Sequence, residues 1–128
     1  MKLYFSWEEA FGRLFPHCSS NSVNNNGVSL LSCLLSDDGG VGLSNTIAWL
    51  DEGMMRIKSV RETDVDFQEW YREDWGAKFM KDKVRIFSLY DEECVELLNL
   101  GSFEKALSAW RDFVVLVPEK GMTQEVEI

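Results

Sequence analysis

The sequence contains few of the residues that active sites and metal centres require. His17 is the single histidine, and the three cysteines, Cys18, Cys33 and Cys94, lie in different segments without a CxxC pair. An odd number of scattered cysteines argues against a disulfide scaffold, and a structural zinc site needs about four Cys or His ligands. Cysteine usage of this kind suits a reducing cytoplasm.

A long apolar run is also missing. The start of the chain carries a base, Lys2, but acids follow before an apolar stretch of signal-peptide length develops. No stretch approaches the roughly 18 apolar residues that cross a bilayer. The sequence therefore predicts a soluble protein that stays in the cytoplasm and has no membrane partner.

Positive charge is scarce relative to negative charge. The 128 residues include 22 Asp and Glu against 13 Lys and Arg, which gives a formal net charge of −9 at pH 7. Nucleic acids repel such a protein, so a cationic protein is the natural partner and nucleic-acid binding is not expected. With 45% apolar residues, 5 Trp and 8 Phe, the chain is expected to fold as one domain, residues 1–128, with its own core.

The motifs that could carry chemistry are weak. His17 and Cys18 are adjacent, and adjacent residues seldom face each other as a Cys–His nucleophilic pair requires. The glycine-rich stretch 39–42 lacks the GK[ST] ending and the GxGxxG spacing of phosphate loops, and is interpreted as a turn. Asp37 and Asp38 lack the alternating acids and terminal Glu of an EF-hand. We therefore expect no catalytic residue, metal site or cofactor.

Helices are predicted at both ends of the chain. Ser6-Trp7-Glu8-Glu9 matches a capping box, and apolar residues at helical spacing extend this predicted helix to residue 15. Ser102 is predicted to cap a second helix, 102–114, whose apolar face would pack on a sheet. Pro118 ends that helix, and residues 119–128 are predicted to form a flexible tail.

Strands are predicted between these helices. Lys81-Asp82-Lys83 is a tight connection typical of an antiparallel hairpin. Residues 44–53 fit a helix or a strand, of which we favour the helix, and residues 69–71 fit a helical turn or an edge strand. The predicted strands are 28–35, 54–60, 77–80, 84–89 and 94–100. The order of elements predicts a single α+β domain with a mainly antiparallel sheet packed by an N-terminal and a C-terminal helix.

The most distinctive segment mixes acids with aromatic rings. Six carboxylates and one base, Arg72, lie between Glu62 and Asp74, with aromatic residues among them. A surface that receives a basic partner can use both, because acids steer the encounter and rings supply desolvated anchors. A second acidic run at residues 91–93 is either a solvated loop or a second contact patch. The predicted partner-binding residues are Asp64, Asp66, Glu69, Trp70, Tyr71, Glu73, Asp74, Asp91, Glu92 and Glu93.

The last third of the chain has an F-x-x-x-L-x-x-W helix, Phe103 to Trp110, after a predicted strand that ends in Asn99-Leu100-Gly101. In a small, acidic, cysteine-poor α+β domain, this pattern resembles bacterial immunity proteins encoded beside contact-dependent growth-inhibition and other polymorphic toxins. The resemblance implies a protein without enzymatic activity that binds a cognate toxin C-terminal domain. That toxin is expected to be basic and nuclease-like, with its active site covered in the complex.

Two other functions remain open on the sequence. A small acidic enzyme could assemble its site from scattered carboxylates around His17, and a cleft holding two acids with perturbed pKa values would indicate it. A regulatory or adaptor domain could bind a helix or a client protein. An exposed apolar groove without flanking acids would indicate that function.

Overall fold

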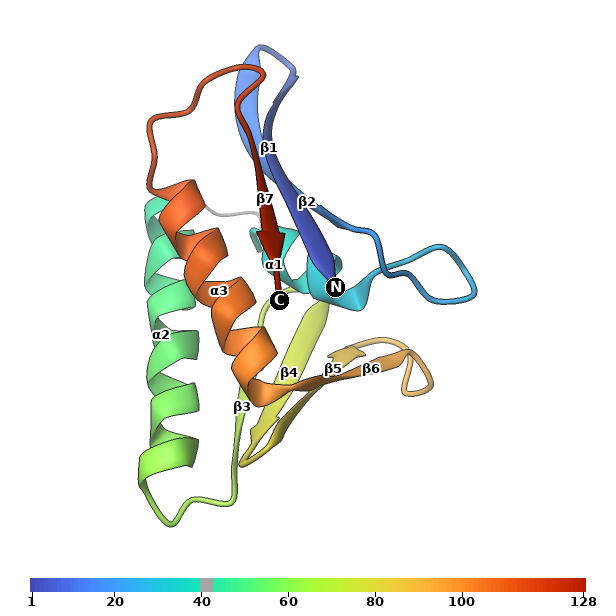
Figure 1. Ribbon diagram of the computed structural model, residues 1–128, viewed down its shortest axis with the longest axis vertical. Coiled ribbons are helices and arrows are strands. Elements are labelled where there is room, and N and C mark those ends of the chain that lie inside the picture. Colours follow the sequence, from blue (N-terminus) through green and yellow to red (C-terminus); the bar gives the residue numbers. More distant parts are fainter. Residues whose placement is uncertain (40–42) are drawn as a thin grey trace.

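The computed structural model describes residues 1–39 and 43–128 and builds them into two sheets and three helices (Figure 1). The strands of the first sheet are β1 (Lys2–Ala10), β2 (Arg13–Ser20) and β7 (Thr123–Glu127). The strands of the second sheet are β3 (Phe67–Tyr71), β4 (Trp75–Met80), β5 (Lys83–Ser88) and β6 (Val95–Asn99). The helices are α1 (Leu30–Ser36), α2 (Leu43–Glu62) and α3 (Leu100–Val114). The predicted α+β class is confirmed.

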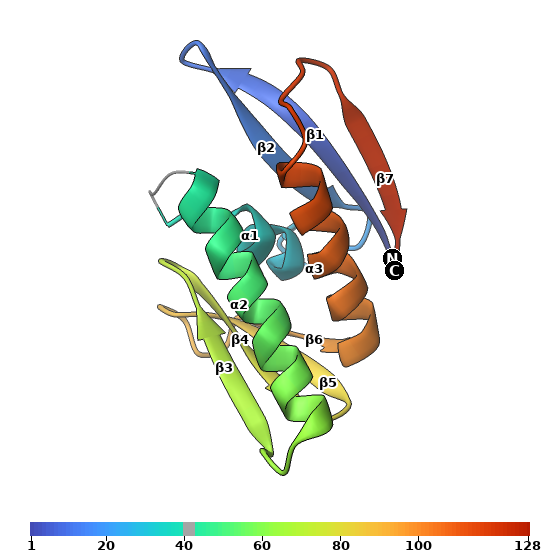
Figure 2. The ribbon, with the colours of Figure 1, turned by 90° about the vertical axis from the view of Figure 1, so that its left-hand side faces the viewer.

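The strands form two antiparallel sheets where one was predicted. Sheet A has the order β2-β1-β7, and sheet B has the order β3-β4-β5-β6. Because β7 runs antiparallel to β1, the two ends of the chain meet (Figure 2). There the Met1 ammonium donates to the Ile128 carbonyl oxygen at 3.3 Å.

Two of the helices contact both sheets and join them into one core. α1 packs on β2 and on sheet B, and α3 reaches from β5 and β6 to β1, while α2 packs on α3, β3 and β4. On the sheet A side, the ring of Phe5 lies 5.0 Å from that of Trp110 and 5.4 Å from that of Phe113. On the sheet B side, Phe79 lies 5.4 Å from Phe103. One cluster of buried residues therefore extends from one sheet to the other.

Residues 6–15 form a hairpin, so the predicted N-terminal helix is wrong. Phe5 and Trp7 are buried at alternate positions of β1, which is the pattern of a strand with one face on a core. Phe11 and Gly12 make the turn, with φ of 54° and 74°. The period of two, which begins at the start of the chain, outweighs the local capping-box pattern.

Two segments predicted as strands are helical. The apolar run 28–35 forms most of α1, whose N-cap Ser29 accepts a hydrogen bond from the Ser32 amide at 3.2 Å. Most of this short helix is buried, and a buried helix shows the same continuous apolar run as a central strand. Residues 54–60 continue α2, so the helix favoured for 44–53 is confirmed but is longer than predicted.

At the C-terminal end the helix was predicted correctly and the tail was not. α3 covers the predicted helix 102–114 and begins slightly earlier, because the Asn99 side chain caps it by accepting from the Ser102 amide at 3.2 Å. Residues 119–128 include β7, so they are not a flexible tail. Val126 packs against the core from that strand. Its partner strand lies at the other end of the chain, which local pattern does not reveal.

The predicted hairpin and edge strand are both part of sheet B. The hairpin around Lys81-Asp82-Lys83 is confirmed as β4 and β5, and the strand at 94–100 is confirmed as β6. Of the alternatives for 69–71, the edge strand is correct, because β3 lies at the edge of sheet B. The glycine-rich turn at 39–42 falls on residues 40–42, which lie outside those that the structure describes.

Replacing Phe11 with asparagine is expected to raise the free energy of unfolding by about 1 kcal/mol, measured by urea denaturation. Phe11 is fully exposed and adopts a left-handed conformation that asparagine tolerates better than a bulky residue. Phe11→Ala is the matched control, since it removes the ring but keeps the backbone strain. Equal stabilisation by both substitutions would contradict this explanation.

Replacing Glu96 with glutamine is expected to stabilise the protein at neutral pH. The Glu96 carboxylate accepts a hydrogen bond from the Leu31 amide at 3.0 Å, and glutamine can replace it there. Burial raises the pKa of Glu96, opposed by that hydrogen bond, so the folded state binds the proton more tightly than the unfolded chain. The contribution of Glu96 therefore becomes more favourable as pH falls from the raised folded pKa toward the ordinary glutamate value.

The measurement is the difference in free energy of unfolding between Glu96→Gln and the natural sequence across the acidic range. This difference is expected to shrink as pH falls, because the protonated glutamate and glutamine become equivalent. A difference that does not change with pH would show that burial of the Glu96 charge is not the cause.

Candidate protein-binding surface

Sheet B packs its inner face on the helices and leaves its outer face open. The register brings side chains from all four strands together on that outer face. One row across the sheet contains Tyr71, Gly76, Phe87 and Val95. The next row contains Glu69, Lys78, Arg85 and Leu97.

Aromatic rings on this outer face are held in place by their neighbours. The ring centroids of Tyr71 and Phe87 lie 6.1 Å apart in an edge arrangement. Both rings pack over Gly76, where a Cβ atom would lie 2.7 Å from Tyr71 Cδ1 and 3.0 Å from Phe87 Cε2. The Lys78 ammonium lies 4.3 Å from the centroid of the Phe67 ring. Phe67 and Tyr71 remain 45% and 46% exposed, so the face offers ordered apolar surface to a partner.

Acids gather where β3 turns into β4 and where β5 leads into β6. The two connections lie side by side, since the Leu89 amide donates to the Asp74 carbonyl oxygen at 3.0 Å and the Tyr90 hydroxyl donates to the Glu73 carbonyl oxygen at 3.4 Å. Tyr90 is 78% exposed between them. We call this group the acidic end: it consists of Glu73, Asp74, Asp91, Glu92 and Glu93, all exposed.

Arg72, the one base between Glu62 and Asp74, does not neutralise the acidic end. The Arg72 guanidinium lies 4.6 Å from the Trp49 ring and donates to Thr46 Oγ1 at 3.1 Å and to the Asp38 carbonyl oxygen at 3.0 Å. Arg72 is thus directed toward α2. The carboxylates of the acidic end keep their negative potential toward solvent.

The structure brings together some of the predicted partner-binding residues and separates others. Glu73 and Asp74 of the first predicted cluster join the second predicted cluster, residues 91–93, in the acidic end. Glu69 and Tyr71 lie on the adjoining outer face, where the Tyr71 hydroxyl donates to the Glu69 carboxylate. Asp64 and Asp66 lie at the opposite end of β3, in the loop after α2 (Figure 1).

The placement of Trp70 on the surface is wrong. Its side chain is only 1% exposed, its ring lies 3.8 Å from that of Trp49, and its Nε1 donates to the Trp49 carbonyl oxygen at 3.0 Å. Strand alternation explains the difference, because in β3 the neighbours Glu69 and Tyr71 face outward while Trp70 faces inward. Trp70 is a core residue.

Sequence reasoning missed two rings of this surface, the exposed Tyr90 and the half-buried Phe87, together with the bases of the outer face. Tyr90 adjoins the acidic run at residues 91–93, and Phe87 lies within the predicted strand 84–89. Alternation along that predicted strand places Phe87 on the same face as Arg85, so the sequence does carry a signal for Phe87. Lys78, Lys83 and Arg85 on β4 and β5 make the outer face basic away from the acidic end.

His17 and Cys18 do not form a nucleophilic pair. In β2 they point to opposite faces: Cys18 is buried, whereas His17 Nδ1 lies 3.6 Å from Glu8 Oε2 on the exposed face. Burial raises the pKa of the Cys18 thiol to about 11, so little of the thiolate forms at neutral pH.

In the part of the chain that is described, no group of three or more His, Cys, Asp or Glu side chains is arranged to hold a metal ion. Over the same residues, no helix combines the length and the apolar character that crossing a membrane requires.

Comparison with known proteins gives no relative from which a function could be transferred. The chain matches no protein-family model, no curated protein and no solved structure. Its function must therefore be argued from the surface described above.

Proposed function

We propose that this chain is an immunity-type protein, which binds a basic toxin domain through the acidic end and the adjoining aromatic face and covers the toxin's active site. The observation that carries the proposal is the convergence of two acidic connections around the exposed ring of Tyr90. Acids and accessible aromatic rings in one place are what a cationic protein partner can use.

Electrostatics favours such a partner. Toxins that act on nucleic acids need Lys and Arg around the substrate cleft, and a cluster of carboxylates can occupy such a cleft as a phosphate mimic. The acidic end lies on a protein of net charge −9, so long-range attraction adds to the local one. Fast capture follows from this charge complementarity.

The rings of the surface supply the anchors. Tyr71 and Phe87 form one end of the outer face, and Tyr90 projects from the acidic end beside them. Tyrosine combines a large apolar ring with a polar tip, and it is enriched among the residues that dominate binding energy. The acids would raise the rate of association, and the rings would raise the affinity of the complex.

The acidic end is also preorganised by its own turns. The Glu93 amide donates to Asp91 Oδ1 at 3.0 Å, and the Cys94 amide donates to the Asp91 carbonyl oxygen at 3.1 Å. The Arg72 amide closes the other turn by donating to the Trp75 carbonyl oxygen at 2.9 Å. Little ordering of these acids is needed when a partner binds, which favours affinity.

The test is growth rescue by this chain. The basic protein that co-purifies with it from its native host, with retention that falls as salt rises, is produced alone in a test strain and is expected to arrest growth. Co-production of this chain is expected to restore growth. A captured protein that is not basic, or whose toxicity this chain does not relieve, would overturn the proposal.

A further inference from the structure

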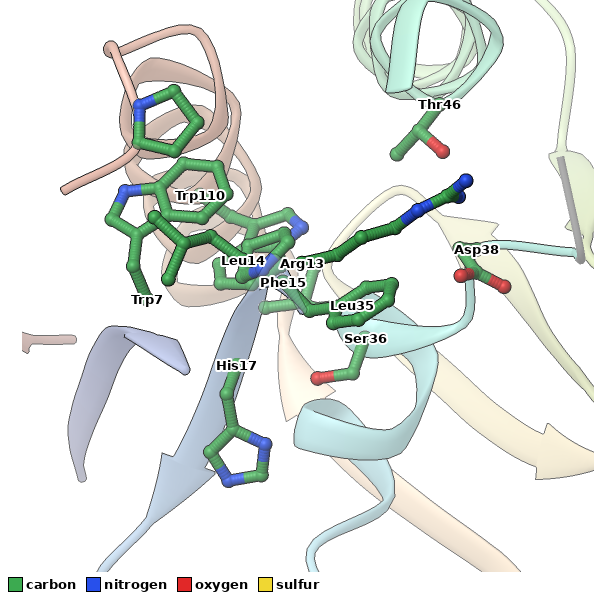
Figure 3. A pocket seen from close by; sticks show the side chains of 12 residues that line it. Trp7, Arg13, Leu14, Phe15, His17, Leu35, Ser36, Asp38, Thr46 and Trp110 are labelled. Carbon is green, nitrogen blue, oxygen red and sulfur yellow. The ribbon is translucent and has the colours of Figure 1, made fainter. Parts of the chain in front are cut away.

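A cavity of about 430 Å³ lies beside sheet A, between the edge strand β2, helix α1 and the facing ends of α2 and α3 (Figure 3). Its volume falls within the range of small-molecule sites. The indoles of Trp7 and Trp110 lie at one end (Figure 3). From β2, the Arg13 side chain crosses the cavity toward Thr46 and Asp38 at the other end. The cavity thus has an apolar end and a polar end.

Polar atoms without a partner are concentrated around this cavity. Across the described residues, four buried side-chain nitrogen or oxygen atoms have no hydrogen-bond partner within the protein. Three of them, Trp7 Nε1, Trp110 Nε1 and Ser36 Oγ, belong to residues that line the cavity. The fourth is Arg72 Nε, whose guanidinium donates to the lining residue Thr46. Buried polar groups are nearly always paired, so this concentration calls for an explanation.

The identity of the unpaired groups limits what could pair with them. An indole N–H only donates, and the two tryptophans, 3% and 1% exposed, cannot turn to bulk solvent. A group that pairs with the indoles must therefore bring acceptor atoms. Arg13 adds a positive charge whose planar donors fit a carboxylate.

We propose that the cavity binds a small carboxylate with an aromatic body. The carboxylate lies beside Arg13, and the aromatic body packs against Trp7 and Trp110. The carboxylate oxygens are the only acceptors of such a ligand, and solvent does not reach either indole nitrogen in the unliganded arrangement. Pairing of Trp110 Nε1 with the carboxylate beside Arg13 therefore requires a small rotation of that indole, whereas Trp7 contributes its ring alone. Asp38 lines the same end as Arg13, and its negative charge favours a singly charged ligand over a phosphate. This inference does not depend on the proposed function, because sheet B contributes no residue to the cavity lining.

The test uses heteronuclear NMR of the indole N–H groups with phenylacetate as the probe. Saturable shifts are expected for the signals of Trp7 and Trp110. The signals of Trp49 and Trp70 are internal controls, because their N–H groups already donate to the carbonyl oxygens of Tyr71 at 2.7 Å and of Trp49 at 3.0 Å. Phenethylamine, with the same ring and the opposite charge, is expected to give no saturable shift.

Two substitutions separate the proposed site from non-specific attraction. Arg13→Gln is expected to weaken phenylacetate binding about five-fold or more, because it removes a charge-assisted hydrogen bond. The neutral phenylacetamide should bind the natural sequence more weakly than phenylacetate does, and Arg13→Gln should not change its affinity. Arg85→Gln on sheet B removes the same charge elsewhere and is expected to leave both unchanged. Equal effects of the two substitutions, equal shifts with the amine, or no saturable shift with any probe would overturn the proposal.

Discussion

Replacing Trp70 with alanine is expected to lower the free energy of unfolding by about 3–5 kcal/mol. The ring is buried and stacked on Trp49, and it also lies 5.8 Å from Phe79 and 6.4 Å from Phe103. The substitution removes these contacts and leaves a cavity where α2, α3 and sheet B meet. Because small domains are stable by only about 5–15 kcal/mol, the variant should lose much of its stability. Urea denaturation followed by circular dichroism measures the loss.

Tyr71→Ala is the matched control, because it removes the next ring along the same strand. Tyr71 is 46% exposed and contacts Phe87 across the sheet, so a loss of about 1 kcal/mol or less is expected. If Trp70→Ala were no more destabilising than Tyr71→Ala, the assignment of Trp70 to the core would be wrong. The two substitutions also help to interpret binding experiments. A Trp70→Ala variant that fails to bind a partner would indicate unfolding rather than the loss of a contact.

The close packing around Trp70 explains a residue that helix propensity would not select. Gly53 lies inside α2, where glycine is unfavourable. A Cβ atom at Gly53 would lie 2.8 Å from Trp70 Cε2 and 3.2 Å from Leu107 Cδ2. The glycine lets α2 approach the ring closely. The sequence alone places Gly53 at the end of a predicted helix, because the contact that requires it comes from another element.

Elements whose signals are local were predictable from the sequence. The hairpin at Lys81-Asp82-Lys83 and the helix 102–114 each carry their turn or cap and their periodicity within one segment. Residues 28–35 failed for the opposite reason, since a continuous apolar run fits a buried helix and a buried strand equally. β7 failed because its partner is β1, and no local pattern records a pairing between the two ends of the chain.

The candidate surface was predictable in its chemistry and only partly in its geometry. The acids at 73–74 and 91–93 were identified from composition. A hairpin centred on Asp82 implies that these two runs meet, because they flank it at similar distances along the chain. The sequence fits a helical turn or an edge strand at 69–71, so it does not determine which way the Trp70 ring points. The structure forms the strand, and strand alternation turns that ring into the core. Tyr90 carried no signal beyond its place in a turn.

Neutralising the acidic end is expected to slow association with the captured basic partner by about 10- to 100-fold at low salt. The variant combines Glu73→Gln, Asp74→Asn, Asp91→Asn, Glu92→Gln and Glu93→Gln. Asparagine at position 91 keeps the acceptor that closes the turn to Glu93, so the substitutions remove charge while preserving that hydrogen bond. Stopped-flow association rates at rising ionic strength measure the effect, and the two proteins should converge at high salt, where screening acts within a few ångströms.

The matched control removes the same amount of charge elsewhere on the surface. It combines Glu62→Gln, Asp64→Asn, Asp66→Asn, Asp82→Asn and Glu119→Gln, all at exposed positions outside the acidic end. Net charge alone would slow both variants equally, whereas a localised contact slows only the first. The control includes Asp64 and Asp66, which the sequence placed in the contact surface and the structure places at the far end of β3. If the control variant associates as slowly as the acidic-end variant, Asp64 and Asp66 belong to the interface. If the acidic-end variant associates at the unchanged rate, the acidic end is not part of the interface.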